Sequence, residues 1–337
     1  SMTAQEKKRY SAVEGGFSFL GAILAYVVVS VVASFVMGGI EDGSTGKTLA
    51  EFFFGLAIQA VMITAALLPA RLLGSRMTYS FRPVPARTLG VSVLIAVVCV
   101  AGFEGISLAF NCALVFGAGY DMSGVVELTG ALAVVLAVIR TVLVAPLCEE
   151  TLFRGSVLSS LGLMGTMNEG KRIPFMVTMC GLMFALIHMN PMQTVYQFLL
   201  GCALAYTVIR FGSIIPAIVI HALNNAVGLV LSAPAVDGAV TSWLGTVFGS
   251  GGTIAAFVAV SLALAVGAGF AVRALCRKFG GASLLSPVHH PDSPERAEDF
   301  RNYADDGGSM AGGIMYVVGA IICVVMWVTA LAGGLSA

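Results

Sequence analysis

The sequence predicts an all-α polytopic membrane protein with about eight to nine transmembrane helices. Three observations predict this fold class. Apolar residues make up 58% of the 337 residues and charged residues only 11%, whereas a soluble domain carries about 25% charged residues. The apolar residues gather in stretches near the ~20 residues that a helix needs to cross a bilayer. Lys and Arg are concentrated in alternate loops between these stretches.

Gaps between the apolar stretches set the expected organisation of the chain. The segment 235–251 is rich in Gly and Ser and is expected to form an exposed loop or a re-entrant piece. Met189-Asn190-Pro191 predicts a helix break, because proline cannot continue a helix. The polar stretch 283–310 predicts a solvated linker. We expect spans near residues 17–38, 49–70, 89–116, 131–161, 173–190, 192–210, 213–233, 252–274 and 312–333.

These spans divide the chain into five parts. Residues 1–130 hold the N-terminal helices, and residues 131–233 form a central core of four helices. Residues 234–275 add a span with its preceding loop, residues 276–311 form a cytoplasmic polar linker, and residues 312–337 form a C-terminal span.

Charge placement predicts the orientation in the membrane, since Lys and Arg are retained on the cytoplasmic side. Basic residues precede the first span and follow the second, fourth, sixth and eighth. The other loops carry Asp and Glu, with Lys47 as their single base. The pattern predicts a multi-pass protein of the cell membrane with a cytoplasmic N-terminus. The lipid bilayer is an expected partner, and a formal net charge of zero gives no indication of nucleic-acid binding.

Ionisable side chains inside spans are costly and usually mark a functional site or a buried pair. Glu104 of the third span and Arg140 of the fourth could form such a pair. The seven cysteines form no CxxC pair and are expected to pack as small apolar residues. The central spans carry a further group of polar side chains: Glu149, Glu150, Arg154, His188, His221 and Asn225.

Spacing predicts how this group is arranged. Glu150 and Arg154 are four residues apart on one helical face and are expected to pair. Glu149 then points about 100° away and is free for chemistry. The fourth and fifth spans are expected to form an antiparallel hairpin, which places Glu149 and His188 at similar depth. The set is therefore expected to surround one intramembrane site.

Three motifs share these residues. Glu149-Glu150-Thr-Leu-Phe-Arg154 reads EExxxR, Phe184-Ala-Leu-Ile-His188 reads FxxxH, and His221-Ala-Leu-Asn-Asn225 reads HxxxN. In this order they resemble the CPBP family of intramembrane proteases, also called the Abi family. That family includes the CAAX prenyl endopeptidases and bacteriocin-processing proteins. The resemblance covers roughly residues 130–233.

The resemblance implies an intramembrane endopeptidase that cleaves a membrane-associated peptide or protein, with residues 131–233 as its catalytic core. Glu149 would be the catalytic glutamate and His188 its partner in activating water. His221 and Asn225 would stabilise the oxyanion. Glu150 and Arg154 would be a structural acid–base pair, and Phe184 could wall His188 at helical spacing. No cofactor and no metal site are predicted on this basis.

Other functions use the same residues. Two histidines and a carboxylate could hold a catalytic zinc ion, although no HExxH helix is present. A non-catalytic membrane scaffold or immunity protein would need only the spans. A secondary transporter could relay protons through buried Glu and His, but the inverted repeats typical of transporters are not evident in the sequence.

Overall fold

The computed structural model describes residues 9–121, 130–164, 169–248, 251–281 and 308–336. Within these ranges, eight helices are long and apolar enough to cross a membrane. A ninth is counted if the bent pair Ile215–Leu231 and Val236–Phe248 forms one span. The predicted all-α polytopic fold and its eight to nine spans are therefore confirmed.

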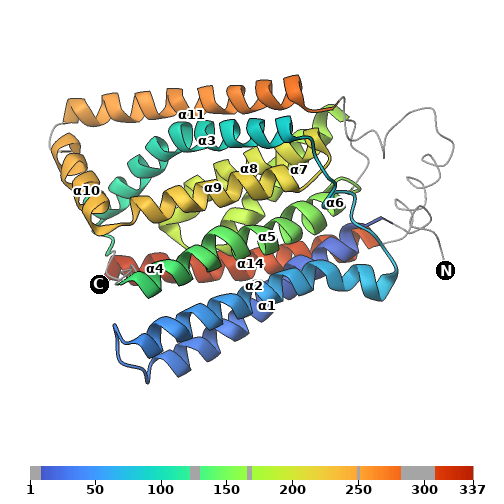
Figure 1. The fold of residues 1–337 in the computed structure, drawn as a ribbon, viewed down its shortest axis with the longest axis horizontal. Helices are drawn as coiled ribbons and strands as arrows, with labels where there is room; N and C mark the ends of the chain where they lie inside the picture. The colour runs from blue at the N-terminus through green and yellow to red at the C-terminus, as the bar shows by residue number, and fades with distance from the viewer. Residues whose placement is uncertain (1–8, 122–129, 165–168, 249–250, 282–307, 337) are drawn as a thin grey trace.

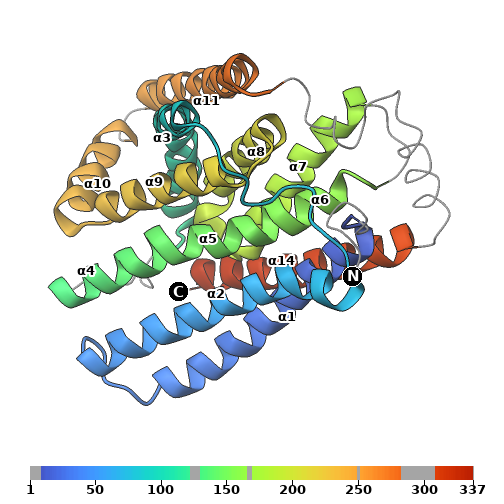
Figure 2. The ribbon, with the colours of Figure 1, turned by 45° about the vertical axis from the view of Figure 1, so that its right-hand side comes forward.

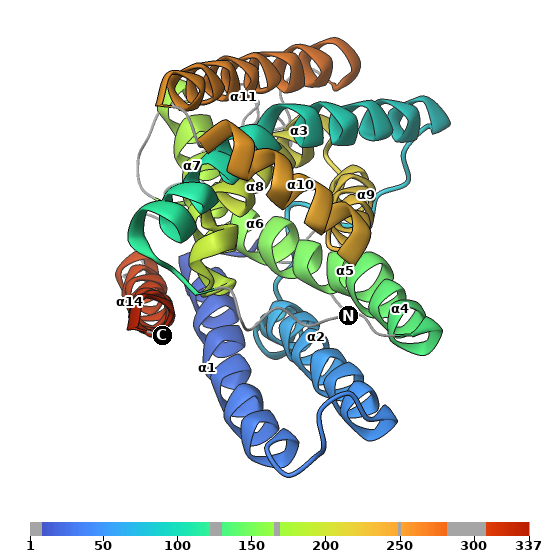
Figure 3. The ribbon, with the colours of Figure 1, turned by 90° about the vertical axis from the view of Figure 1, so that its left-hand side faces the viewer.

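The helices form two outer groups around a central one (Figure 1). Along one edge, α3 (Ala86–Cys112), which π-helical η1 (Ala113–Gly117) extends, packs against α11 (Gly251–Phe279). Along the other edge, α1 (Ala12–Met37) packs against both α2 (Thr45–Leu73) and α14 (Gly308–Ser336). The view of Figure 3 shows the same grouping, with the remaining helices between these edges.

The fourth span runs through the middle of the molecule and is not a uniform α-helix (Figure 2). Pro146 has no backbone N–H, so it interrupts the regular hydrogen-bond ladder of a helix. Two π-helical segments flank the short α-helix that carries Glu149 and Glu150, and such segments are frequent at functional sites. The span consists of α4 (Ala131–Ala137), η2 (Val138–Val144), α5 (Ala145–Glu150), η3 (Thr151–Val157) and α6 (Leu158–Leu161).

A short hairpin packs against this span. Its helices α7 (Glu169–Ile187) and α8 (Thr194–Phe211) have 19 and 18 residues, whereas the other long spans have 26 to 32. Gly181 and Gly201 let the two helices approach closely, because a Cβ on Gly201 would lie 2.9 Å from the Cα of Gly181. Small residues have this role at helix contacts in membranes.

The turn of this hairpin forms where the sequence predicts a break. Met189 adopts a left-handed conformation with φ of 48°, and Pro191 starts the 3-10 helix η4 (Pro191–Gln193). The side chain of Asn190 accepts a hydrogen bond from the backbone N–H of Met192 at 2.9 Å. His188 follows directly after the last residue of α7, so this turn fixes its position between the two helices.

The Gly- and Ser-rich segment at 235–251 was expected to form an exposed loop or a re-entrant piece. The exposed loop is wrong for residues 235–248, which are helical, whereas a re-entrant piece is one of the two forms that the bent helix pair allows. After α9 (Ile215–Leu231), the chain bends by 77° into α10 (Pro234–Phe248). In Figure 1, α10 lies across one end of the bundle between α9 and α11. Most of the predicted linker at 276–311 falls on residues 282–307, outside the described residues.

Loops with basic residues meet at one end of the bundle. The backbone N–H of Tyr10 donates to the carbonyl of Arg76 at 2.9 Å. The hydroxyl of Ser213 donates to the carbonyl of Arg82 at 2.6 Å. The N–H of Gly281 donates to the carbonyl of Arg210 at 3.1 Å. These contacts join loops that the charge pattern assigns to one side of the membrane.

Candidate active site

A cavity of about 650 Å³ lies among the central helices and is lined by Glu149, His188, His221 and Asn225. These side chains come from α5, the end of α7 and α9. The residues that share the three sequence motifs are thus brought together, although up to 76 positions separate them in the chain. The turn of the α7–α8 hairpin forms part of the cavity wall through Asn190.

The ion pair predicted from spacing is formed. Arg154 Nη1 donates to Glu150 Oε1 at 2.9 Å, and both side chains are fully buried. Arg154 Nη2 donates to the carbonyl of Gly201 at 3.0 Å, and its Cζ lies 4.3 Å from the ring centre of Phe184. A buried charge needs such partners, because desolvation is otherwise very costly. The pair joins the fourth span to α7 and α8.

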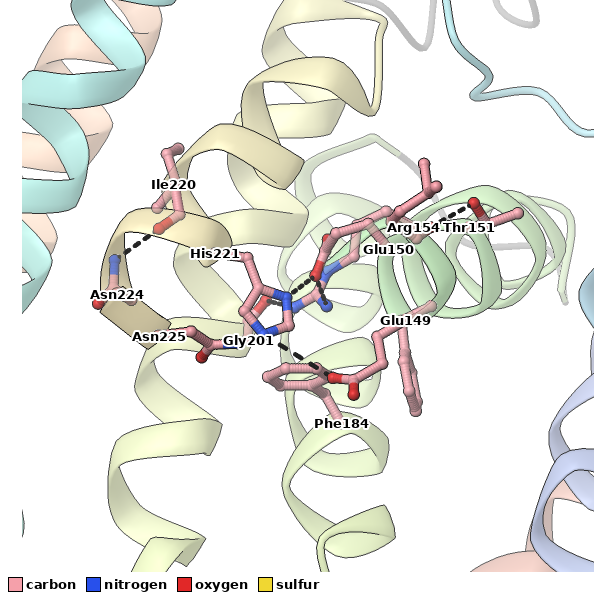
Figure 4. Close-up of polar contacts among 12 residues, drawn as sticks. Glu149, Glu150, Thr151, Arg154, Phe184, Gly201, Ile220, His221, Asn224 and Asn225 are labelled. Atoms are coloured by element: carbon pink, nitrogen blue, oxygen red, sulfur yellow. Dashed lines mark hydrogen bonds and ion pairs between the residues drawn. The ribbon is translucent and has the colours of Figure 1, made fainter. Parts of the chain in front are cut away.

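His221 stands between the two glutamates (Figure 4). Its Nδ1 is 2.8 Å from Glu150 Oε1 and its Nε2 is 3.8 Å from Glu149 Oε2. An ionised carboxylate only accepts hydrogen bonds, so Nδ1 carries the proton in the contact with Glu150. Nε2 is thereby aimed at the cavity and at Glu149. Glu150 holds His221 in place as well as pairing with Arg154, a contact that the motif spacing did not predict.

Glu149 itself is held by a residue that the sequence analysis missed. Gln59 of α2 donates from Nε2 to Glu149 Oε1 at 2.9 Å, and both side chains are buried. The available signal was a lone amide inside an otherwise apolar span, but its partner could not be read from spacing. The contact brings α2, which lies outside the motif-bearing spans, into the site.

His188 is fixed by its own helix. Its Nδ1 lies 2.7 Å from the carbonyl oxygen of Phe184, and a carbonyl only accepts hydrogen bonds, so Nδ1 carries the proton and Nε2 is left as the acceptor. The Phe184 ring packs edge-on against His188, with centroids 5.0 Å apart, and against His221, with centroids 5.5 Å apart. Phe184 therefore walls both histidines, one more than expected.

Asn225 makes a bond that its expected role did not include. Its Nδ2 donates to the backbone carbonyl of Thr141 at 2.7 Å. The neighbouring bond, from the N–H of Ala145 to the carbonyl of Arg140, has the π-helical register. In that register the donor for Thr141 would be residue 146, which is proline and has no N–H. Asn225 thus supplies the missing hydrogen bond and ties α9 to η2.

Two other polar residues have partners that the sequence did not specify. Asn224 accepts a hydrogen bond from the hydroxyl of Tyr196 on α8. The suggested pair between Glu104 and Arg140 is not formed among the ion pairs of the described residues. Arg140 Nη1 instead donates to the backbone carbonyl of Glu51 at 3.2 Å. Glu104 and Arg140 both line the cavity.

The donor geometry of the site also bears on metal binding. Among the described residues, no group of three or more His, Cys, Asp or Glu side chains is arranged to hold a metal ion. Two Nε2 atoms, of His188 and His221, remain available for chemistry at the cavity, because in each ring the hydrogen bond is made through Nδ1.

Comparison with known protein families finds a match over part of the chain. Residues 130–227 match the family model described as Rce1-like, the type II CAAX prenyl endopeptidase family. No curated protein and no solved structure is detectably similar to the chain. The matched segment contains all three motifs and the described helices from α4 through most of α9. The match supports the assignment of residues 130–227 to the CPBP family of CAAX-type intramembrane proteases, the family that the three motifs resemble.

Proposed function

We propose that this protein is an intramembrane endopeptidase in which Glu149 activates a water molecule to hydrolyse a peptide bond. The observation that carries the proposal is the position of His221, whose Nδ1 contacts Glu150 while its Nε2 faces Glu149 across 3.8 Å. A carboxylate, two oriented imidazoles and a cavity on the scale of a peptide segment are the components that peptide hydrolysis requires.

In the proposed first step, the Glu149 carboxylate takes a proton from water as the water oxygen attacks the scissile carbonyl. Gln59 holds one carboxylate oxygen at 2.9 Å, which leaves the other free to accept the proton. Nε2 of His188 accepts the second hydrogen of the water and so orients it. An oriented base within hydrogen-bond reach of the proton is the geometric requirement for general-base catalysis.

In the second step, the tetrahedral oxyanion is stabilised and then collapses. His221 is placed to donate from Nε2 to the oxyanion when its ring carries a second proton taken up from solvent, a charge that the Glu150 carboxylate at Nδ1 would stabilise. The second N–H of the Asn225 amide is the other donor, since one is bonded to Thr141. Removing such a donor typically slows the reaction ~100- to 1,000-fold. Protonated Glu149 finally returns its proton to the leaving amine, which completes the hydrolysis.

The wall of the cavity supports a peptide as the substrate. Gln59, Asn111 and Gln197 line the cavity, and their side-chain oxygens are buried and make no hydrogen bond within the described residues. Buried acceptors without partners are costly, and a peptide backbone offers N–H groups at regular intervals. We therefore propose a membrane-associated peptide or protein that enters in an extended form.

A zinc-dependent mechanism remains the alternative for the same residues. The contacts of Glu149 with Gln59 and His221 support its proposed role as the base. Activity that survives dialysis against a chelator, with less than stoichiometric zinc by elemental analysis, is the result that we expect. Loss of activity on chelation and its return with zinc would reverse the assignment.

We also propose that the N-terminus is cytoplasmic. The end of the bundle that gathers the loops at Arg76, Arg82 and Arg210 would then face the cytoplasm, as the retention of basic residues on that side requires. The cavity residues Asn111, Arg140 and Leu229 lie near the other ends of their spans, so this end of the cavity would lie nearer the outer surface.

The test is cleavage in water enriched in oxygen-18. Purified protein in liposomes is incubated with a membrane-protein extract, and new C-termini are identified by mass spectrometry. We expect wild type to produce labelled C-termini and Glu149→Gln to produce none. Glu41→Gln, the same chemical change in an exposed loop, is the matched control and should cleave normally. Equal cleavage by wild type and Glu149→Gln would overturn the mechanism. No cleavage by either would favour a scaffold.

A further inference from the structure

The cavity is lined by a second glutamate, which the proposed mechanism does not use. Glu104 lies in α3, a helix that carries none of the three motifs, and it lines the cavity together with Glu149. Its side chain is half-buried. An ionisable side chain at this depth is costly unless it serves a pair or a ligand.

The carboxylate of Glu104 has no partner among the described residues, since it takes part in none of their ion pairs or side-chain hydrogen bonds. Glu149, by contrast, accepts a hydrogen bond from Gln59. Arg140, the cation suggested as the partner of Glu104, donates to the carbonyl of Glu51 instead. The Glu104 carboxylate is therefore available to a group that enters the cavity.

The packing of α3 against α11 holds Glu104 toward the cavity. A Cβ on Gly102 would lie 2.1 Å from Ala268 Cβ, and a Cβ on Gly105 would lie 2.8 Å from Ser261 Oγ. The two helices approach this closely because both positions are glycine, as at other helix contacts in membranes. The contact fixes the rotation of α3 about its axis, so the carboxylate is preorganised at the cavity wall.

The wall around Glu104 is rich in hydrogen-bond acceptors. Asn111, seven positions later on the same face of α3, and Gln197 of α8 also line the cavity, and the side-chain oxygen of each is buried without a hydrogen bond in the described residues. The hydroxyl of Tyr196 donates to Asn224, so it can only accept from a further group. Peptide N–H groups can serve the neutral oxygens, whereas a desolvated carboxylate needs a cation.

A chain of contacts relates Glu104 to the bond that is cleaved. Glu104 is close enough to Tyr196 to act electrostatically on its hydroxyl, and Tyr196 contacts Asn224. Asn224 lies three positions after His221 on α9, a rise of about 4.5 Å, and an extended peptide advances about 3.3 Å per residue. The carboxylate therefore lies roughly two substrate residues or more from the bond at Glu149.

From these contacts we infer that Glu104 binds a basic side chain of the substrate, Lys or Arg, and so selects peptides with a cation near the cleaved bond. The inference rests on the proposed function and adds a charge requirement to it. An ammonium or guanidinium group forms charge-assisted hydrogen bonds with a carboxylate. Its remaining N–H groups are suited to the free oxygens of the wall. Glu104 acts on substrate binding and takes no part in the proton transfers at Glu149.

The experiment uses short synthetic peptides in lipid vesicles that contain the purified protein. Each N-palmitoylated peptide is made with Lys or with Gln at one position, and this position is moved along the peptide. Equilibrium binding is measured on Glu149→Gln protein, in which the catalytic carboxylate can neither attract the cation nor cleave the peptide. Mass spectrometry of wild-type reactions gives the cleaved bond and kcat/KM for each pair.

Glu149→Gln protein should bind the Lys form more tightly than the Gln form by roughly ten- to a hundredfold at one position. Adding Glu104→Gln should make the two forms equal. Adding Glu104→Asp keeps the charge on a shorter side chain and should retain part of the preference. Glu41→Gln, the same chemical change in an exposed loop, is the matched control and should retain all of it.

A further variant perturbs the site without removing the charge. Gly105→Ala inserts a methyl group against Ser261, which should displace α3 and weaken the preference for Lys. Gly90→Ala is its control on the same helix, because a Cβ there meets no atom within 4 Å. Thermal unfolding in detergent confirms that each variant is folded.

The outcomes separate this inference from the proposed function. If Glu149→Gln protein binds the Lys and Gln forms equally at every position, or if adding Glu104→Gln leaves the preference unchanged, the inference is wrong even when peptides are cleaved. An equal loss of affinity for both forms would also overturn it, because Glu104 would then only shape the cavity wall. If no peptide is cleaved but Glu104-dependent binding of the Lys form persists, the proposed function fails alone.

Discussion

The side-chain amide of Asn225 donates to the backbone carbonyl of Thr141 at 2.7 Å, at the position where Pro146 removes the backbone donor. A backbone carbonyl without a partner is expensive inside a membrane, because lipid offers no hydrogen bonds. Asn225 is therefore a link between α9 and the fourth span, whatever it contributes to the oxyanion. The two roles can be separated by experiment.

Asn225→Ala should lower the free energy of unfolding by about 1–3 kcal/mol, the usual cost of an unpaired buried polar group. Pro146→Ala restores an N–H that can reach the Thr141 carbonyl, so the double variant should lose less than the sum of the single variants. Thermal unfolding in detergent measures this coupling. Additive losses would show that the proline does not create the need for Asn225.

The same pair of variants tests catalysis. If the second N–H of Asn225 contacts the oxyanion, the double variant should regain stability but remain ~100-fold or more below wild type in kcat. Full recovery of kcat together with stability would restrict Asn225 to the structural role. Pro146→Ala alone is the control for changes in helix register.

Arg154→Met should be among the most destabilising substitutions in the core. It leaves the Glu150 carboxylate buried without its cation, a defect that typically costs about 3–5 kcal/mol. Combining it with Glu150→Gln removes the buried charge and should recover part of the loss. The yield of folded protein and its unfolding temperature report both effects, and Arg71→Met at an exposed site provides the baseline. A stable Arg154→Met protein would contradict this account of the pair.

Gln59→Leu should slow the chemical step without weakening substrate binding. The substitution removes the donor that fixes Glu149 Oε1, so we expect kcat to fall about tenfold, the equivalent of one hydrogen bond to a charged group, while KM stays near wild type. Thr64→Val, on an exposed face of α2, is the matched control. An unchanged kcat would mean that Glu149 is oriented by its own helix.

The C-terminal span should influence the site through one tryptophan. Trp327 Nε1 of α14 donates to Thr194 Oγ1 at 2.8 Å, and Thr194 Oγ1 donates to the carbonyl of Asn190 at 2.9 Å. Trp327→Phe should therefore loosen the turn next to His188, with a loss of about 1 kcal/mol in stability and a lower kcat. Trp243→Phe, an exposed residue of α10, should change neither. A wild-type kcat in Trp327→Phe would show that α14 does not influence the active site through this residue.

Membrane orientation can be checked with single cysteines. An impermeant maleimide applied to intact cells should label Asp42→Cys but not Arg82→Cys, because the proposed topology places residue 42 outside and residue 82 in the cytoplasm. Lysed cells should label both, which controls for accessibility. The reverse pattern in intact cells would invert the proposed topology.

Sequence patterns predicted the features that depend on residue spacing within one helix or on the length of an apolar span. The Glu150–Arg154 pair follows from an interval of four residues, and the break before Pro191 follows from proline chemistry. Contacts between spans that are far apart in the sequence could not be predicted from these patterns. Gln59 and Glu149 are 90 positions apart, and the partner of Arg140 is a backbone carbonyl that no side-chain pattern reveals.

The error at residues 235–248 has a different cause. Gly and Ser are poor helix formers in isolation, so composition favoured a loop. In the structure α10 packs against α9 and α11, and tertiary contacts and length outweigh intrinsic preference. The π-helical segments of the fourth span were also not predicted. They depend on which carbonyl each N–H reaches, and residue type alone does not specify that choice.

The spacing of Glu150 and Arg154 also bears on biogenesis. Because the two residues are four apart on one helix, their opposite charges can neutralise each other before any other span is present. A nascent fourth span would enter the lipid from the translocon with the charges of Glu150 and Arg154 already paired. His221, 71 positions after Glu150, would contact Glu150 later, during assembly of the helices. Insertion and maturation of the active site would then be successive events, with the same glutamate serving in both.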